Sequence, residues 1–315
     1  MIYCLAHHII SPLGDGSRAN WEAVRAGKSG LRYYTDRFAD VEPFCASLFA
    51  EPQKFVPLCL HSAKQAIEEA KIDPASKDVV FVLSTTKGDN LDLITPAQQI
   101  AKHFGNPNEP IVVSNACTSG VCAQITAMRL LEAGIYQHAV VIGCDIQTRF
   151  IVSGFQAFKA LSLEPCLPFS ENRKGLNLGE AAATIIWSNQ ENGGWKLMAG
   201  SIHNDANHIS APSRTGEGAY RCLQDVMSGV QPEDIELLGV HGTATPYNDA
   251  MEQVAIERAG LQNVQISALK PYFGHTMGAA GVLETIICML TAKKQFIKML
   301  SGFGGVNAAI RLKCE

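Results

Sequence analysis

The feature that most restricts the fold of this 315-residue chain is a repeated alternation of short β-branched runs with longer helical segments. Residues 79–83 (VVFVL), 110–113 (PIVV) and 139–143 (AVVIG) are runs of the kind that lie in a sheet buried on both faces. Segments 59–71 and 117–134 flank them and show the apolar spacing of helices. The pattern predicts an α/β fold with buried sheets.

The second half of the chain repeats this scheme. It predicts strands at 237–240, 264–267 and 305–312, and helices at 246–259 and 276–293. A strand, a small-residue loop and an apolar helix follow one another around 114–120 and again around 270–281, which indicates a duplicated architecture. Residues 31–57 are expected to be irregular, because proline and aromatic residues interrupt every period there.

Composition excludes several classes of function. Hydrophobic residues make up 47% of the chain, and the net charge is −4 without basic clusters, so a nucleic-acid partner is not expected. No apolar run approaches the ~18 residues of a membrane span, and the opening MIYCLAHHIISPLG lacks a basic segment, so neither a span nor a signal peptide is expected. The ten cysteines are scattered without CxxC spacing, which favours reduced thiols in a cytoplasmic protein.

The first motif with chemical potential is VSNACTSGVCAQ at 113–124. A strand ends near its start and a helix begins within a few residues, so Cys117 is expected at a sharp turn near a helix N-terminus. Free N–H groups there favour a thiolate, which predicts a pKa below the ~8.5 of free cysteine, and they can also bind a tetrahedral oxyanion. Ala116, Ser119 and Gly120 are expected to leave room for substrate. A buried core cysteine is the alternative interpretation.

The second motif is GVHGTATPYND at 239–249. His241 follows a strand, and Pro246 is well suited to open the next helix. The end of a strand is a common place for functional residues in α/β folds. Thr243 and Thr245 can hydrogen-bond an amide-bearing arm. A histidine that merely caps a turn is the alternative.

The third motif is SALKPYFGHTMGAAGVLE at 267–284, which places Lys270, His275 and Glu284 around one loop. The glycines and alanines at 278–281 allow close backbone packing, which alone would explain the helix but not the ionisable groups. Together the three motifs supply one nucleophile and two imidazoles, each at a strand-to-helix loop. One site can therefore gather Cys117, His241 and His275.

At this point the motifs resemble a known family. NACTSG, HGTATPYND and KPYFGHTMGAAG are similar, in this order, to the three signatures of β-ketoacyl-acyl-carrier-protein synthases of the elongating Cys-His-His class. Segments 160–183, 204–218 and 302–310 (GFGGVNAAI) resemble further parts of the family pattern. The resemblance covers both ends and most of 110–312, and it is poor over about 32–75.

The resemblance implies a thiolase-like fold, in which two similar α/β halves form α-β-α-β-α layers. Residues 1–190 would carry the nucleophile and residues 191–315 the two histidines. It implies an acyltransferase, a 3-oxoacyl-acyl-carrier-protein synthase, that performs a decarboxylative Claisen condensation in fatty acid, polyketide or polyene biosynthesis.

The family mechanism implies a role for each matching residue. Cys117 would take an acyl group from acyl carrier protein, and His241 and His275 would hydrogen-bond the malonyl thioester oxygen while carbon dioxide leaves. The backbone N–H groups of Cys117 and Phe303 would form the oxyanion hole, and Phe303 would gate the acyl pocket. Lys270 and Glu284 would support the electrostatics of the site. Thr243 and Thr245 would hold the phosphopantetheine arm.

The resemblance also implies partners. Substrates would arrive on the phosphopantetheine arm of acyl carrier protein, with no metal and no bound organic cofactor, and the chain would form a homodimer or a heterodimer with a related subunit. The chain departs from the family by being shorter at 85–110, 187–200 and 294–302, where members build the subunit interface and the substrate tunnel. Single-residue departures are Ser170, Leu176 and Ser301, and none removes a catalytic group.

Other classes of protein remain as alternatives. A non-catalytic subunit of the chain-length-factor kind usually lacks the nucleophile, which Cys117 supplies here. A degradative thiolase would need a second cysteine in the C-terminal loop, which reads SGFGGVN, and an initiating synthase would have Asn in place of His275. For a metal hydrolase, His203 and His208 lack an acid-rich ligand set.

Overall fold

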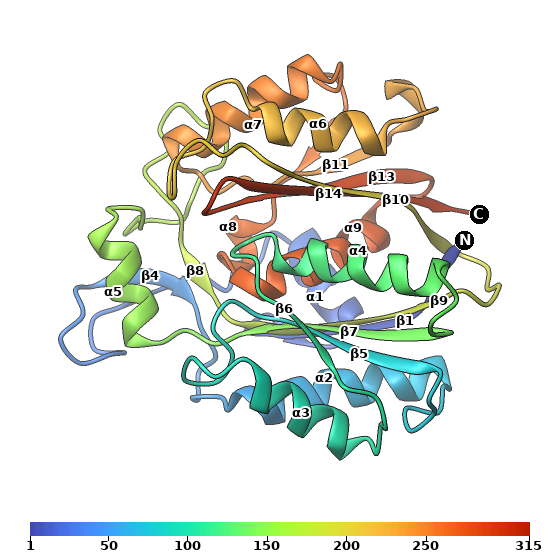
Figure 1. Ribbon diagram of the computed structural model, residues 1–315. Coiled ribbons are helices and arrows are strands. Elements are labelled where there is room, and N and C mark those ends of the chain that lie inside the picture. The colour runs from blue at the N-terminus through green and yellow to red at the C-terminus, as the bar shows by residue number, and fades with distance from the viewer.

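The structure, a computed structural model, describes residues 1–315 and contains two half-sheets with helices on both faces of each (Figure 1). The first half-sheet runs β1-β9-β7-β5-β6 and the second runs β10-β14-β13-β11-β12. The first consists of β1 (Ile2–Ser11), β5 (Val79–Ser84), β6 (Ile111–Val113), β7 (His138–Asp145) and β9 (Ala181–Ser188). The second consists of β10 (Trp195–Asn204), β11 (Leu237–Gly239), β12 (Gln265–Ser267), β13 (Gln295–Gly302) and β14 (Val306–Cys314).

The two half-sheets have the same topology. If the five strands of each half-sheet are numbered in chain order, their order across the sheet is first, fifth, fourth, second, third. Parallel pairing joins β7, β5 and β6, and likewise β13, β11 and β12, while the remaining neighbours are antiparallel. A short antiparallel pairing of β1 with β10 links the halves at Ile2 and Leu197. The predicted boundary between residues 190 and 191 falls in the loop between β9 and β10.

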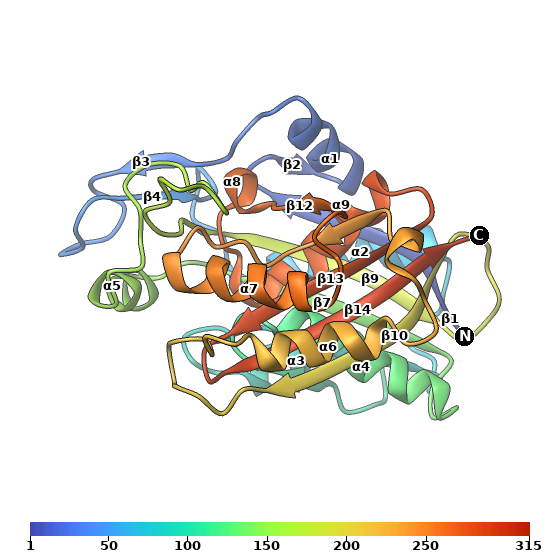
Figure 2. The same cartoon turned by 90° about the horizontal axis from the view of Figure 1, so that it is seen from above.

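Helices complete five layers, α-β-α-β-α, which Figure 1 shows from the side, while Figure 2 looks down on the same stack from above. The outer layers are α2 (Phe55–Ala70) and α3 (Ile94–His103) on the first half-sheet, and α6 (Glu217–Val226) and α7 (Pro246–Arg258) on the second. Between the half-sheets lie α4 (Ser119–Glu132) and α9 (Ala280–Thr291). The layered α/β arrangement predicted from the sequence is therefore confirmed. None of the helices is long and apolar enough to cross a membrane.

The two central helices approach each other through glycines. A Cβ added at Gly120 would lie 2.8 Å from the Cα of Gly281, and one at Gly281 would lie 2.3 Å from the nitrogen of Val121. Residues of α9 are buried on every side from Ala280 to Met289, because both half-sheets cover this helix. Gly120 therefore makes room for α9, and the prediction that it leaves room for substrate is wrong.

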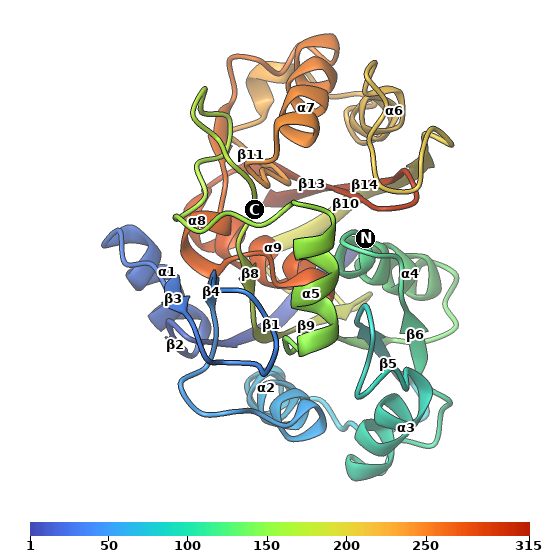
Figure 3. The same ribbon diagram turned by 90° about the vertical axis from the view of Figure 1, so that its left-hand side faces the viewer.

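Smaller elements gather at one side of the molecule, where Figure 3 shows α5 in front of the layers. They include a three-stranded sheet, β3-β4-β8. The bounds of all the smaller elements, at this side and elsewhere, are α1 (Ser17–Arg25), α5 (Arg149–Ala157), α8 (Lys270–Phe273), β2 (Gly14–Asp15), β3 (Arg32–Tyr34), β4 (Phe44–Ser47), β8 (Leu178–Gly179) and the 3-10 helices η1 (Pro232–Asp234) and η2 (Met277–Ala279). Because β3 and β4 lie within 31–57, the expectation of wholly irregular structure there is wrong.

Two further differences from the sequence-based expectation have local causes. The helix expected over 276–293 begins only at Ala280, because Met277 has a φ of 52°, outside the right-handed helical region. The strand β1 was not predicted, because His7 and His8 interrupt its apolar run.

Candidate active site

Cys117 lies in the tight turn between β6 and α4. Ala116 before it has a φ of 47°, in the left-handed region that non-glycine residues adopt only when their surroundings hold them there. The hydroxyl of Ser119 donates to the carbonyl of Ala116 at 2.6 Å and accepts the N–H of Asn115 at 2.7 Å. Ser119 thus fixes the turn, and the prediction that it leaves space for substrate is wrong.

His275 lies in the loop between α8 and η2, and its ring orientation is set by the backbone that follows. The N–H of Met277 donates to Nδ1 of His275 at 3.4 Å, which places the ring proton on Nε2. The N–H of Gly278 donates to Oδ2 of Asp145 at 2.7 Å, and the carbonyl of Gly278 accepts a hydrogen bond from the hydroxyl of Ser84 at 2.6 Å. The ends of β5 and β7 therefore hold the loop that selects the tautomer of His275.

His241 lies just beyond β11, and buried charged groups fix its backbone. The carboxylate of Glu252 on α7 accepts the N–H groups of His241 at 2.6 Å and Gly242 at 2.7 Å. The ammonium of Lys298 donates to the carbonyl of Val240 at 2.7 Å. Burial raises the pKa of Glu252 to about 7, although both backbone N–H groups act to lower it.

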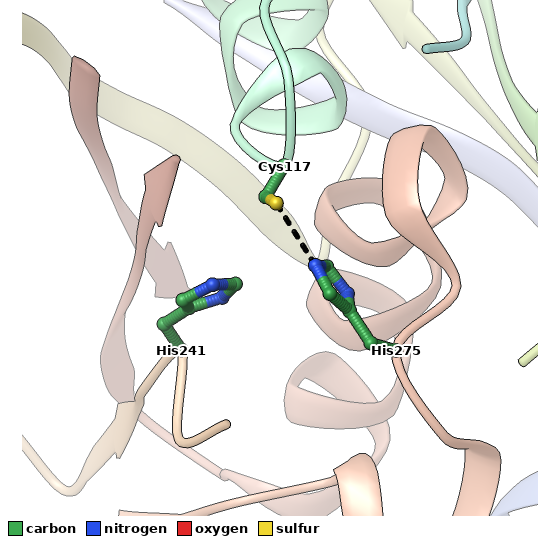
Figure 4. A group of neighbouring side chains, drawn as sticks. All are labelled: Cys117, His241 and His275. Atoms are coloured by element: carbon green, nitrogen blue, oxygen red, sulfur yellow. Dashed lines mark hydrogen bonds between the residues drawn. The ribbon is translucent and has the colours of Figure 1, made fainter. Parts of the chain in front are cut away.

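The three predicted reactive side chains meet at one point (Figure 4). Nε2 of His275 lies 2.9 Å from Sγ of Cys117, and the rings of His241 and His275 stand 5.1 Å apart, nearly edge to face. One donor atom from each of the three lies within 4.8 Å of the other two. All three side chains are buried, so their polar atoms face one another with little water to compete.

Two buried lysines share one carboxylate beside this cluster. Nζ of Lys270 lies 2.9 Å from Oε1 of Glu284, and Nζ of Lys298 pairs with Oε2 of the same residue. The trio carries one more positive charge than negative. Burial, followed by the charge of Lys270, holds the pKa values of His241 and His275 well below the usual range of histidine. Both imidazoles are therefore neutral and can act as hydrogen-bond donors.

The thiol of Cys117 does not have the lowered pKa expected from its position. Burial raises its pKa to about 11, and the charge of Lys270 and the backbone N–H groups of Phe303 and Cys117 act in the opposite direction. Desolvation of the thiolate outweighs these contacts, because the side chain is 6% exposed. The thiolate must therefore form transiently, and the neighbouring donors serve to stabilise it when it does.

A cavity of about 490 Å³ lies over the cluster and includes Cys117, His241 and His275 in its lining. Thr243 and Thr245 also line it, with their hydroxyl oxygens 2.9 Å apart. The structure thus brings both threonines to the cavity where the sequence predicted an arm-binding site.

Phe303 lines the same cavity and is 37% exposed. Its ring stacks on Phe155 of α5 at 5.9 Å and meets Phe158 edge to face at 5.6 Å. Behind it, a Cβ added at Gly302 would lie 3.2 Å from the backbone nitrogen of Cys117, so this strand end packs closely against the nucleophile turn. The predicted gate residue therefore stands at the boundary between the cluster and α5.

Sequence reasoning missed three residues that support the site. Asp145 ends the apolar run of β7, and Lys298 interrupts the apolar run of β13. Glu252 lies in α7, the helix that follows the His241 loop. Each of the three is at most 2% exposed. For Asp145 and Lys298, a charged residue at the end of or inside an apolar run was the signal that could have found them, whereas Glu252 lies on a largely polar helix that gives no such signal.

His203 and His208, the two histidines considered as metal ligands, each have a separate hydrogen-bond partner. Nε2 of His203 lies 2.7 Å from Asp225, while Nδ1 of His208 accepts the N–H groups of Ser210 and Ala211. Neither belongs to a group of three metal-ligating side chains.

Family models match two long segments of the chain. The model of the β-ketoacyl synthase N-terminal domain matches residues 92–192, and that of the C-terminal domain matches residues 197–303. The 3-oxoacyl-[acyl-carrier-protein] synthase 2 of Staphylococcus aureus is 26% identical, over 90% of this chain and 86% of its own length.

Solved structures share the fold over the whole chain. A ketosynthase in complex with its chain length factor from Xenorhabdus doucetiae has a TM-score of 0.89 at 24% identity, covering 100% of this chain and 98% of that one. A type II polyketide synthase ketosynthase in complex with its acyl-carrier protein has a TM-score of 0.87 at 19% identity, covering 100% and 99%. The fold predicted from the three motifs is thereby confirmed.

Proposed function

The chain belongs to the β-ketoacyl synthase family, and from this premise we propose that it is an acyltransferase that joins an acyl group to a malonyl unit by decarboxylative Claisen condensation. The observation that carries the proposal is the convergence of Cys117, His241 and His275 on one cavity. A nucleophile and two neutral imidazole donors are the groups that this reaction requires.

The first half-reaction would load the nucleophile. Sγ of Cys117 attacks the thioester carbonyl of an acyl carrier protein, and the thiol of the carrier leaves. The backbone N–H groups of Cys117 and Phe303 act on the sulfur, which supports a role for them in binding the oxyanion. The strained turn at Ala116 holds the sulfur toward the cavity.

The second half-reaction would form the carbon–carbon bond. A malonyl thioester enters, its carboxylate leaves as carbon dioxide, and negative charge develops on the thioester oxygen. The Nε2–H of His275 and the ring of His241 stabilise that enolate oxygen, because both imidazoles are neutral donors in a buried site. The enolate carbon attacks the acyl carbonyl on Cys117, the bond to sulfur breaks, and the free enzyme returns.

The residues around the cluster would have supporting roles. Lys270 would supply positive charge beside the histidines, and Glu284 would hold it in place together with Lys298, so that the trio keeps one net positive charge there. The hydroxyls of Thr243 and Thr245 would bind the amides of the phosphopantetheine arm. Phe303 would gate the acyl side of the cavity, where it packs on Phe155. The substrates bring their own pantetheine arm, so no further cofactor is proposed.

We also propose the partners and the setting. The substrate donor is an acyl carrier protein, since a solved relative is a ketosynthase in complex with one. The assembly is a homodimer or a heterodimer with a related subunit, since another solved relative is in complex with its chain length factor. The product belongs to fatty acid or polyketide biosynthesis in the cytoplasm.

The test is condensation by the purified chain. We expect release of carbon dioxide and a β-ketoacyl product when acyl and malonyl carrier proteins are supplied together, and loss of both with His241→Ala or His275→Ala. Retained loading of Cys117 in these variants would separate the two half-reactions. Wild-type protein that neither loads nor condenses, alone or with a related subunit, would overturn the proposal.

A further inference from the structure

A second cavity, of about 700 Å³, lies apart from the one described above and shares no lining residue with it. It is bounded by the start of α2, the loop after β5 and the loop after β7. Its volume is in the range of small-molecule sites. The mechanism makes no use of it.

The buried cation in the lining of this cavity is Lys87. Its side chain is 6% exposed, and its ammonium makes one hydrogen bond, to the carbonyl of Gly88 at 3.3 Å. No carboxylate lies within ion-pair distance of it, in contrast to Lys270 and Lys298. An ammonium has three donors, and buried cations normally have them satisfied. At least two donors of Lys87 are therefore free for a group in the cavity.

The acceptor side of the cavity is Gln147. Its Nε2 donates to the carbonyl of Gly179 at 2.6 Å, which fixes the orientation of the amide. Its Oε1 is buried without any hydrogen-bond partner, and the residue is 4% exposed. An occupant that meets both residues must accept from an ammonium and donate to an amide oxygen.

The start of α2 adds a third feature. Lys54 precedes this helix without capping it by a side chain, and the first turn has no acidic residue. The N–H groups of Phe55 and Val56 therefore remain without helical partners at the wall of the cavity. The N-terminus of a helix of this length attracts anions.

The charges around the cavity favour the same sign of ligand. The lining has three positive groups, Arg37, Lys54 and Lys87, against Asp89 and Glu180. Asp145 does not line the cavity, but it is near enough for the charge of Lys87 to act to lower its pKa. Both carboxylate oxygens of Glu180 already accept hydrogen bonds, one from the N–H of Gln147 and one from the N–H of Phe49 in the loop after β4. Asp89 is exposed to solvent.

We propose that this cavity binds a small oxyanion that also carries a hydrogen-bond donor, such as hydrogen phosphate or the hydroxycarboxylate group of a small metabolite. The anionic oxygens meet Lys87 and the start of α2, and the hydroxyl of the ligand donates to Oε1 of Gln147. Sulfate, which has no donor at neutral pH, satisfies only the first of these contacts.

The test is equilibrium dialysis with radiolabelled inorganic phosphate on the full chain. Wild-type protein should bind one phosphate per chain, and Lys87→Met should bind it about tenfold more weakly or worse, because a charge-assisted contact is lost. Lys64→Met is the matched control, since Lys64 lies on α2, whose start bounds the cavity, but is exposed, pairs with Glu68 and does not line the cavity. This control should bind phosphate as the wild type does.

Competition experiments test the donor requirement and the source of the anion. Unlabelled phosphate should displace the label better than sulfate, and glycolate better than acetate, with Gln147→Leu abolishing both preferences. Whichever of phosphate and glycolate competes better identifies the class of natural ligand. Absence of saturable binding by the wild type, or equal binding by Lys87→Met, would overturn the proposal. The readout is binding, so it is independent of condensing activity, and Gln147→Leu keeps the test valid if Lys87→Met does not fold.

Discussion

Nε2 of His275 lies 2.9 Å from Sγ of Cys117, although 158 positions separate these residues in the chain. Cys117 comes from the first half-sheet's β6–α4 turn and His275 from the loop that follows the second half-sheet's β12. The close approach of α4 and α9 at Gly120 and Gly281 brings the two loops together. The reactive contact therefore depends on packing between the halves as much as on the loops themselves.

The first prediction concerns the pH dependence of Cys117. Burial raises its pKa to about 11, so the thiolate is a small fraction at neutral pH and its population grows as pH rises. The rate of alkylation of Cys117 by iodoacetamide should increase about tenfold per pH unit from about pH 7 to 9 without a plateau. Peptide mass spectrometry measures the rate at this residue. A plateau below pH 8 would show a thiolate that is already formed, as the sequence alone predicted.

The second prediction concerns the clamp on the His275 loop. Asp145→Asn weakens the hydrogen bond that Asp145 accepts from the N–H of Gly278. Because Met277 precedes Gly278, this also loosens the hydrogen bond from the N–H of Met277 that fixes Nδ1 of His275. Condensation should fall by about tenfold to a hundredfold, in keeping with the loss of one charge-assisted hydrogen bond, while acyl loading of Cys117 changes less. Rates of both half-reactions, measured separately over a range of pH, check this.

Asp225→Asn is the control for this variant, because Asp225 is partly exposed and contacts Ser201 and His203 outside the cavity. It should leave both half-reactions near the wild-type rate. Equal losses of loading and condensation in Asp145→Asn would point to a general structural role for the clamp.

The third prediction concerns the carboxylate shared by two lysines. Glu284→Gln leaves Lys270 and Lys298 buried without a counter-charge, which should cost about 3–5 kcal/mol of the free energy of unfolding. Lys298→Met should cost less, because Glu284 keeps its pair with Lys270. Urea unfolding at constant pH measures both changes. Equal destabilisation by the two substitutions would contradict the shared-carboxylate account.

The fourth prediction concerns the contact between the central helices. Gly120→Ala places a Cβ 2.8 Å from the backbone of Gly281, so overpacking should destabilise the fold by about 1–3 kcal/mol or more. Gly154→Ala in α5 is the matched control, because nothing lies within 4 Å of its added Cβ. The control should be neutral or slightly stabilising, since alanine favours a helix by up to about 1 kcal/mol over glycine. Similar destabilisation by both substitutions would contradict the contact with Gly281 as the cause, because helix propensity favours alanine at both positions.

Much of the fold followed from the sequence, because buried parallel strands such as 79–83 are nearly continuous apolar runs and their signal is local. The strand β1 was missed since His7 and His8 are tolerated there by contacts with residues beyond the strand's end: Nδ1 of His7 lies 3.0 Å from the hydroxyl of Ser17, and His8 pairs with Asp15. Such compensation is tertiary and leaves no period in the sequence.

The site was predicted through its motifs, and its electrostatics were not. Cys117, His241 and His275 each stand at a loop that the local pattern reveals, and their convergence is now seen. The pKa of Cys117 is raised and not lowered as predicted, because burial against groups from the second half, such as His275 and Gly302, outweighs the favourable contacts of its own turn. Lys298 was missed for the same reason: only the folded chain shows that it meets Glu284.

The most direct test of the central claim is the intact mass of the protein after incubation with a short-chain acyl carrier protein, measured for wild type and for Cys117→Ala. The account predicts a mass increase of one acyl group on the wild type and none on Cys117→Ala. An equal mass increase on Cys117→Ala, or no increase on the wild type across several acyl lengths and with a related subunit present, would contradict it.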